Sequence, residues 1–545
     1  MLLPFALILV VLLKVVNANA QSSVTITTTS GRLQGIEGDG VTSFKGVRFG
    51  QPPTGSQRWT PPVAFVSNST QNAKVLGPAC VQQFPFAVAA LNELLFNNPQ
   101  DPPTEDEDCL FLNVWAPSTK PTNTTSSLKP VVFWIYGGAL VFGTGSVPLY
   151  DGMSLASNQD IVVVTSNYRT NVFGFPGAPD LPLQENNLGF MDQELALQWV
   201  RSNIQAFGGD PDRITLMGQS AGAVSVAEFV SRHPIDPPFR AAILFSGATP
   251  NSAPFSPTAF GPFNDFSTAL NCTQPPGAER LACLKALSAD VIRAYTNGPT
   301  SGIFGAVVDN VTSFDDNLNR ILLNSTARVP QLVGNTQNDG TLFTVGQSNL
   351  SAFLDSFDLG GIISPDTVRA LYPGQNDTNV IADAYRDIVF LCPASLWTQA
   401  FVQSGISSVF RYEYGQLSYA FCTYSSYITI NLPIGAVFPD LQVFPNAGAF
   451  HASDLQEVFG TYNASTATAN EITLSKTYQT AIANFIKNPD QSPAPNWPKY
   501  LPGNNTKTLA RLAYNGNVDT GNFVQAEKSN SQDSPCTELW NIFLV

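Results

Sequence analysis

The stretch that decides the fold runs from Ile214 to Arg232 and reads ITLMGQSAGAVSVAEFVSR. Its first four residues, ITLM, include no charged side chain on either face of the expected strand. This is typical of a strand that is covered on both sides of a sheet. Gly218–Gly222 (GQSAG) then matches the pattern G-x-S-x-G, and a helical pattern follows from Ala221. A strand, a tight turn and a helix in this order form a nucleophile elbow. We therefore predict that Ser220 is a nucleophile.

Similar apolar runs lie on both sides of the elbow. Val131–Tyr136 (VVFWIY), Ile161–Ser166 (IVVVTS) and Ala241–Phe245 (AAILF) are expected to be buried strands, and Asp192–Ile204 has helical periodicity. Strands that alternate with helices favour a mixed, mostly parallel central sheet flanked by helices. With the elbow, this pattern predicts an α/β-hydrolase fold. Because no repeat or linker divides the chain, we expect one such domain over residues 21–545, with long insertions.

The composition is that of a folded, acidic protein. Hydrophobic residues make up 43% of the chain and charged residues only 12%, which excludes extensive disorder. The formal net charge of −14 argues against nucleic acids and anionic membrane surfaces as partners.

The first twenty residues are predicted to be a signal peptide. An apolar run from Pro4 to Leu13 is followed by Ala18-Asn19-Ala20, a typical A-x-A cleavage site, so the mature chain is expected to start near Gln21. The alternative of a membrane anchor is disfavoured, because this run is too short to span a bilayer. Nine N-glycosylation sequons also suit a secreted glycoprotein. They are Asn68, Asn123, Asn271, Asn310, Asn324, Asn349, Asn376, Asn463 and Asn504.

Seven cysteines in an oxidising compartment predict disulfides with one thiol left over. Cys272 and Cys283 are near enough in the chain to close a small loop, and Cys80 and Cys109 would close a longer one. The remaining three, Cys392, Cys422 and Cys536, can pair in more than one way. Neither a C-x-x-C motif nor a histidine-rich cluster occurs, so we predict no metal site and no cofactor.

A serine nucleophile needs a base, and the chain contains only two histidines. His233 stands at the predicted end of the helix that begins at Ser220, where a helix of twelve residues would place it roughly 18 Å away. We interpret it as a helix cap or a surface residue. His451, in a loop of small residues far along the chain, is the base by elimination.

The acid of the triad is expected between the serine and the histidine in the chain. Asp339 is the best candidate, because it follows an apolar strand within Val333–Phe343 (VGNTQNDGTLF) and precedes the turn residue Gly340. The same Asn-Asp-Gly stretch is also typical of a plain turn. Spacing alone therefore leaves the choice open.

The strand Val131–Tyr136 runs directly into Gly137-Gly138-Ala139. Small residues at this point allow backbone N–H groups to approach the negative charge of a tetrahedral intermediate. We predict that the N–H groups of Gly138, Ala139 and Ala221 form an oxyanion hole.

Several longer motifs make the chain resemble the type-B carboxylesterase/lipase family, which includes cholinesterases, fungal lipases and sterol esterases. The resemblance covers nearly the whole mature chain. The motifs are Phe44–Pro53 (FKGVRFGQPP) with Arg58, Glu107–Trp115 (EDCLFLNVW), Asn167–Arg169 (NYR), Gly208–Asp212 (GGDPD), Gly448–His451 (GAFH), Val458–Gly460 (VFG) and Trp497–Tyr500 (WPKY).

The resemblance implies two disulfides, Cys80–Cys109 and Cys272–Cys283, and two structural ion pairs, Arg58–Glu107 and Arg169–Asp192. It also supports Asp339 as the acid, although most members of the family have Glu there. An Asp is one methylene shorter, so we expect its loop to lie closer to His451. Ala139 replaces a common Gly of the oxyanion hole, where its N–H remains available and a narrower mouth is expected.

The same comparison guides the substrate class. The loop between Cys80 and Cys109 contains no Trp, and Gln219 stands where cholinesterases have Glu, so choline esters are disfavoured. That loop instead contains the apolar stretch Phe84–Phe96 (FPFAVAALNELLF), which is either a lid, as in fungal lipases of the family, or an ordinary buried helix.

We therefore predict a secreted, extracellular carboxylic ester hydrolase that cleaves apolar esters through a Ser220–His451–Asp339 acyl-enzyme mechanism. A lipase or sterol esterase with a lid and transient contact with a lipid interface is the alternative. A catalytically inactive adhesion protein of the same fold is disfavoured, because such proteins typically lose a triad residue and all three are present here.

Overall fold

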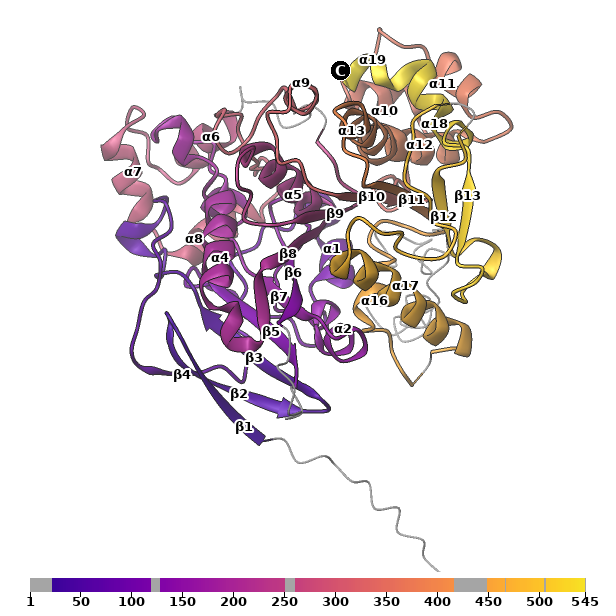
Figure 1. Ribbon diagram of the computed structural model, residues 1–545. Helices are drawn as coiled ribbons and strands as arrows, with labels where there is room; N and C mark the ends of the chain where they lie inside the picture. The colour runs from indigo at the N-terminus through magenta and orange to yellow at the C-terminus, as the bar shows by residue number, and fades with distance from the viewer. Residues whose placement is uncertain are drawn as a thin grey trace, which may run out of the picture.

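A mixed β-sheet runs through the centre of the protein (Figure 1). The structure is a computed structural model that describes residues 22–118, 128–249, 260–415, 448–465, 467–503 and 506–544. Within these residues, thirteen strands form one sheet in the order β1-β2-β3-β5-β7-β6-β8-β9-β10-β11-β12-β13, and β4 pairs with β2. The strands are β1 (Ser22–Thr28), β2 (Gly31–Gly38), β3 (Val41–Arg48), β4 (Thr70–Asn72), β5 (Phe111–Pro117), β6 (Lys129–Ile135), β7 (Val162–Ser166), β8 (Gly209–Gln219), β9 (Ala241–Phe245), β10 (Gln331–Thr336), β11 (Val409–Tyr414), β12 (Leu509–Leu512) and β13 (Val524–Glu527).

The central strands are parallel neighbours, from β7 through β6, β8, β9, β10 and β11 to β12. Antiparallel strands extend this sheet at both ends. The predicted α/β-hydrolase fold, with its mostly parallel mixed sheet, is therefore confirmed. In a parallel sheet the carboxyl ends of the strands lie at one edge, which is where such folds place their sites.

Helices cover both faces of the sheet (Figure 1). Helices α4 and α5 pack on β8 on one side, and α2 and α17 pack on the other. The helices are α1 (Ala89–Phe96), α2 (Met153–Gln159), α3 (Asn171–Gly174), α4 (Leu188–Asn203), α5 (Ala221–Arg232), α6 (Gly261–Ala269), α7 (Ala278–Lys285), α8 (Ala289–Thr296), α9 (Asn317–Leu322), α10 (Leu350–Ser356), α11 (Pro365–Leu371), α12 (Asp377–Arg386), α13 (Cys392–Gln403), α16 (Leu455–Phe459), α17 (Ala469–Lys487), α18 (Asn530–Pro535) and α19 (Asn541–Leu544).

The predicted strands and helices agree with the observed elements where the sequence pattern is local. Ala241–Phe245 is strand β9, and the helix predicted from Ala221 ends at Arg232 as expected. Strand β8 begins at Gly209, five residues before the apolar run that predicted it, because the buried Gly209 pairs with Lys129 ahead of a shift in register. In β6, every residue after Lys129 is buried, as expected of a strand covered on both faces.

Three disulfides join segments of the described chain. Both bonds that the family resemblance implied are present, Cys80–Cys109 and Cys272–Cys283. The pairing that the sequence left open is Cys392–Cys536, which connects the start of α13 to the C-terminal segment. Cys422 lies outside the described residues.

The predicted signal peptide, residues 1–20, lies outside the described residues. The assignment of residues 21–545 to a single domain stays a prediction. Among the described helices, none combines the length and the apolar character that crossing a bilayer requires.

Candidate active site

Ser220 occupies a sharp turn between β8 and α5. Its φ and ψ are 55° and −127°, a conformation that is rare outside glycine. The Ser220 N–H donates to the carbonyl oxygen of Phe245 at 2.9 Å, and its hydroxyl makes no capping bond to α5. A Cβ atom at Gly222 would lie 2.1 Å from the Ile135 carbonyl oxygen. Only a glycine at position 222 therefore allows α5 to approach β6 so closely. The Ser220 hydroxyl, which caps no helix, stays available for chemistry.

Two loops from distant parts of the sequence bring the predicted acid and base together. A β-bridge links Asn338 to Phe450. The Asn338 N–H donates to the Ala449 carbonyl at 2.9 Å, and the Asn338 side-chain oxygen accepts from the Ala449 N–H at 3.0 Å. Gly448 has a φ of 64°, and a Cβ there would lie 2.0 Å from that side-chain oxygen. The bridge places Asp339 beside His451.

The Asp339 carboxylate has three hydrogen-bond partners. One oxygen lies 2.8 Å from His451 Nδ1, and the other accepts from the Ser246 hydroxyl and the Thr336 N–H, both at 2.9 Å. Both Asp339 and His451 are buried. An ionised carboxylate is acceptor-only, so Nδ1 of the imidazole carries the proton and Nε2 is left as the acceptor. A base for the serine requires this tautomer.

The sequence reasoning missed Ser246 and Thr336. Ser246 directly follows β9, and Thr336 is the last residue of β10. A polar residue at the carboxyl end of a parallel strand is the signal that would have indicated Ser246, whereas Thr336 contributes a backbone N–H that almost any residue would supply.

His451 Nε2 has a partner that the sequence reasoning did not identify. The side-chain amide nitrogen of Gln219, the residue before the nucleophile, lies 2.9 Å from it. Within the described part of the chain, no hydrogen bond joins the Ser220 hydroxyl to the imidazole. The amide therefore occupies the position at which the serine proton would be accepted.

Aromatic rings cover the imidazole. The ring centroid of Phe390 lies 4.6 Å from that of His451, and the edge-on ring of Phe343 lies 5.0 Å away. Phe390 belongs to a π-helical turn, Asp387–Leu391, of a kind that often occurs at functional sites. Phe343 also stacks on Tyr385 at 4.9 Å. These contacts make the surroundings of the base apolar.

The predicted oxyanion residues follow β6. Gly138, Ala139 and Leu140 all have positive φ, of 107°, 54° and 62°. The Gly138 carbonyl accepts from the N–H groups of Val141 and Phe142. No acceptor among the described residues binds the N–H groups of Gly138, Ala139 or Ala221. These three donors are therefore available to an oxyanion.

Glycine also sets the distance between the oxyanion turn and the nucleophile. A Cβ at Gly137 would lie 2.8 Å from the Ser220 Cβ and 2.8 Å from the Gln219 side-chain oxygen. The end of β6 can therefore lie directly against the elbow only because residue 137 has no side chain.

Two buried acids follow His451 in the chain: Asp454, directly before α16, and Glu457, on α16. Burial, with the charge of Asp339, raises the pKa of Asp454 to about 7. Burial, with Glu471 and Asp454 nearby, raises the pKa of Glu457 to about 8. The Tyr478 hydroxyl donates to Asp454 at 3.3 Å. Neither side-chain oxygen of Glu457 has a partner among the described residues. At neutral pH Glu457 is therefore largely protonated, whereas Asp454 is near the midpoint of its titration.

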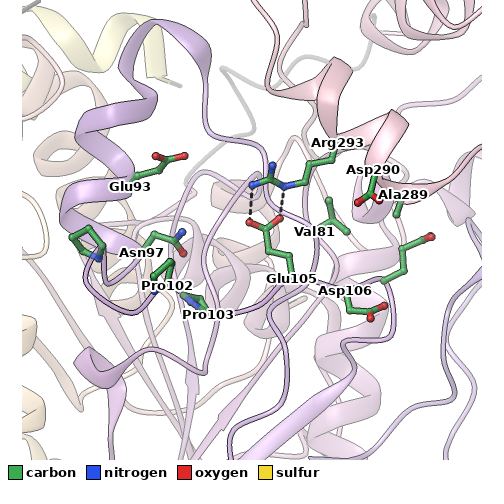
Figure 2. A pocket seen from close by; sticks show the side chains of 12 residues that line it. Val81, Glu93, Asn97, Pro102, Pro103, Glu105, Asp106, Ala289, Asp290 and Arg293 are labelled. Carbon is green, nitrogen blue, oxygen red and sulfur yellow. Dashed lines mark hydrogen bonds and ion pairs between the residues drawn. The ribbon is translucent and has the colours of Figure 1, made fainter. Parts of the chain in front are cut away.

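The loop between Cys80 and Cys109 is tied to α8 at both arms. Figure 2 shows Arg293 donating to Glu105, through two hydrogen bonds of 2.7 and 3.0 Å. Both residues line a cavity of about 700 Å³. On the other arm, the Asn297 side chain accepts from the Phe84 N–H and donates to the Gln82 carbonyl. None of the predicted triad residues lines this cavity.

The remaining polar residues of the prediction have structural contacts. Arg58 pairs with Glu107 at 2.5 Å and Arg169 with Asp192 at 2.8 Å, as the resemblance implied. His233 lies at the C-terminal end of α5, where its Nε2 contacts Glu194 at 3.0 Å. Among the described residues, no group of three or more His, Cys, Asp or Glu side chains is arranged to hold a metal ion.

Comparison with known proteins extends the similarity over nearly the whole chain. The sequence profile of the Carboxylesterase family matches residues 21–358 and 372–532. The chain is 32% identical to the para-nitrobenzyl esterase of Bacillus subtilis (strain 168) over 524 residues, 92% of this chain and 97% of that protein. It is 30% identical to Secreted lipase 1 of Botryotinia fuckeliana (strain B05.10), over 96% of this chain and 94% of that protein. A solved structure of a PNB esterase superposes with a TM-score of 0.72 and 28% identity, over 96% of this chain and 99% of that one.

Proposed function

The chain belongs to the carboxylesterase family, and from this premise we propose how it cleaves its substrates. The family and the esterase relatives make it a serine carboxylic ester hydrolase. We propose that apolar esters are the substrates and that Ser220, His451 and Asp339 carry the reaction. The observation that carries this proposal is the 2.8 Å contact between His451 and the buried Asp339 carboxylate, directly beside the elbow.

In the proposed mechanism, the Ser220 oxygen attacks the ester carbonyl while His451 Nε2 accepts the serine proton. Asp339 stabilises the imidazolium that forms. The N–H groups of Gly138, Ala139 and Ala221 bind the oxyanion. His451 then donates the proton to the leaving alcohol, and an acyl-enzyme remains. Water, activated by the same base, releases the carboxylic acid and restores the serine.

A fluorophosphonate probe tests the nucleophile directly, because it phosphonylates activated serines. We expect mass spectrometry to find the adduct on the peptide that contains Ser220, and Ser220→Ala to lose both the adduct and the hydrolysis of p-nitrophenyl butyrate. Ser202→Ala, an exposed change on α4, serves as the matched control. Full hydrolysis by Ser220→Ala would contradict the proposal.

Secretion is proposed on separate grounds. All sequon asparagines within the described residues are exposed, as attachment of a glycan requires; they are Asn68, Asn271, Asn310, Asn324, Asn349, Asn376 and Asn463. Three disulfides and a relative named a secreted lipase agree with an oxidising compartment. Expression of the full sequence in yeast should deliver the protein to the medium with glycans that an endoglycosidase removes. Retention of unmodified protein in the cytosol would contradict it.

A lipase with interfacial activation is the second candidate. It is favoured by the exposed side chains before α1, where Phe86 is 62% exposed, and by α1 itself, in which only Leu91 is buried. An apolar surface of this kind suits contact with a lipid interface. Hydrolysis of tributyrin should then rise abruptly above its solubility limit. A smooth saturation curve through that limit, with a preference for short soluble esters, would exclude the lipase and favour the carboxylesterase.

A further inference from the structure

Gln219 is placed to control the general base. It is the last residue of β8, only 3% exposed, and its amide nitrogen lies 2.9 Å from His451 Nε2. The other ring nitrogen faces Asp339 and carries the proton. A neutral imidazole has one lone pair, at Nε2, so it can accept one strong hydrogen bond there. The amide and the Ser220 hydroxyl therefore compete for the same lone pair.

We propose that Gln219 is a positioning residue that holds His451 in a resting arrangement, and that its amide must leave Nε2 before each acylation. The proposal rests on the function proposed above, because it concerns the base of that reaction. Gly137 leaves room for the amide, since a Cβ there would lie 2.8 Å from the Gln219 side-chain oxygen. When the amide moves away, the Ser220 hydroxyl donates to Nε2, and its proton passes to that nitrogen as the bond to the ester carbon forms. The amide itself neither gains nor loses a proton.

Two consequences follow for the kinetics. Donation to Nε2 stabilises the neutral imidazole relative to the imidazolium, which keeps the base unprotonated at lower pH. The same hydrogen bond makes the base less available to the serine, by the net free energy of one hydrogen bond. Gln219 thus extends activity toward acid pH and lowers the maximal rate.

The test replaces the donor without changing the length of the side chain. For Gln219→Met, we expect the plateau of kcat/KM for a small soluble ester to rise about fivefold, which corresponds to about 1 kcal/mol. The acid limb of the pH profile should move to higher pH, because the serine hydroxyl that replaces the amide can also accept from the imidazolium, which the amide N–H cannot do. In the Ser220→Ala background, where no serine hydroxyl can replace the amide, Gln219→Met should move the ¹⁵N resonance of His451 Nε2 to lower field at alkaline pH, as expected when an acceptor nitrogen loses its donor. The chain has only two histidines, so His233→Gln assigns the signal.

Gln219→Glu provides a second test that does not depend on the folding of the methionine variant. A carboxylate can only accept, so it stabilises the imidazolium, and the acid limb should lie above those of both Gln219→Met and the unmodified protein. Gln198→Met, an exposed change on α4, is the matched control and should leave the profile unchanged.

The proposal is overturned if Gln219→Met lowers the plateau or leaves the acid limb in place, or if the limb moves to lower pH. The last result would mean that the amide oxygen faces the imidazole and accepts from it. Failure of the function proposed above would look different, because Ser220→Ala would then retain activity in the same assay.

Discussion

Asp339 uses its two oxygens for different tasks. One oxygen accepts from His451, while the other is held by the Ser246 hydroxyl and the Thr336 N–H. The carboxylate therefore cannot rotate without losing two hydrogen bonds, and the orientation of the imidazole follows from it. At the scale of single residues, the site depends on polar groups that have no role of their own in the reaction.

Asp339→Asn should lower kcat by about 10³- to 10⁴-fold, because the amide can donate to Nδ1 and so favours the tautomer in which Nε2 carries the proton. The circular dichroism spectrum should be retained, since the side chain keeps its shape. Steady-state kinetics with p-nitrophenyl butyrate measures the effect, and Asp212→Asn, which is exposed, is the control. Near-normal turnover would move the acid to a neighbouring carboxylate.

Glu457 makes stability depend on pH. Burial, with Glu471 and Asp454 nearby, raises its pKa from the ordinary value of 4.5 to about 8 in the folded protein. Between these values the unfolded chain loses the proton and the folded protein keeps it, so the free energy of unfolding falls as pH rises, by at most about 1.4 kcal/mol per unit. Glu457→Gln removes this loss.

Urea unfolding at pH 5 and pH 8 measures the difference. The stability gained by Glu457→Gln should be larger at pH 8 than at pH 5, by a few kcal/mol. The exposed Glu279→Gln on α7 should show no such dependence on pH. An equal effect of Glu457→Gln at both pH values would mean that the carboxyl is already ionised in the folded protein.

At the scale of elements, local patterns predicted more than distant contacts did. The elbow, β9 and α5 follow from apolar runs and glycines within a few residues. The acid needed the family resemblance, because an Asn-Asp-Gly turn has no chemistry of its own. The amide of Gln219 and the ring of Phe390 were missed, since their contacts with His451 arise only when segments far apart in the chain meet.

The Cys80–Cys109 loop is anchored to the end of another element, helix α8. Asn297→Ala removes the two hydrogen bonds that tie Gln82 and Phe84 to the end of α8, so amide exchange in residues 82–97 should accelerate about tenfold. Hydrogen–deuterium exchange measures it, and Asn319→Ala, exposed on α9, is the control. Unchanged exchange would mean that the Glu105–Arg293 ion pair and the disulfide hold the loop without these two bonds.

At the scale of the molecule, Cys392–Cys536 joins segments 144 residues apart. It lies in a second small core, with Val380 and Trp540, that packs α10 and α12 against the C-terminal segment. The sequence could not identify this pair, because three cysteines allow three pairings and only the folded chain brings two of them together.

Loop-closure entropy predicts different losses for the disulfides. Replacing both Cys392 and Cys536 by Ala should cost about 5 kcal/mol of unfolding free energy, and replacing Cys272 and Cys283, which are 11 residues apart, should cost about 3 kcal/mol. Guanidinium unfolding of the two double variants provides the comparison. The opposite order would mean that strain or residual structure in the unfolded chain outweighs loop length.

The bridge between Asn338 and Phe450 limits which changes in chain length the active site can tolerate. It fixes the acid and the base relative to each other from the two ends of a long intervening segment, residues 341–447. Insertions and deletions in the loops of that segment leave the bridge in register as long as β11 stays in the sheet and Phe343 and Phe390 stay against the imidazole, so loop length can change while the acid–base geometry stays constant. Loop variation and acid–base geometry are thus separable in this part of the chain.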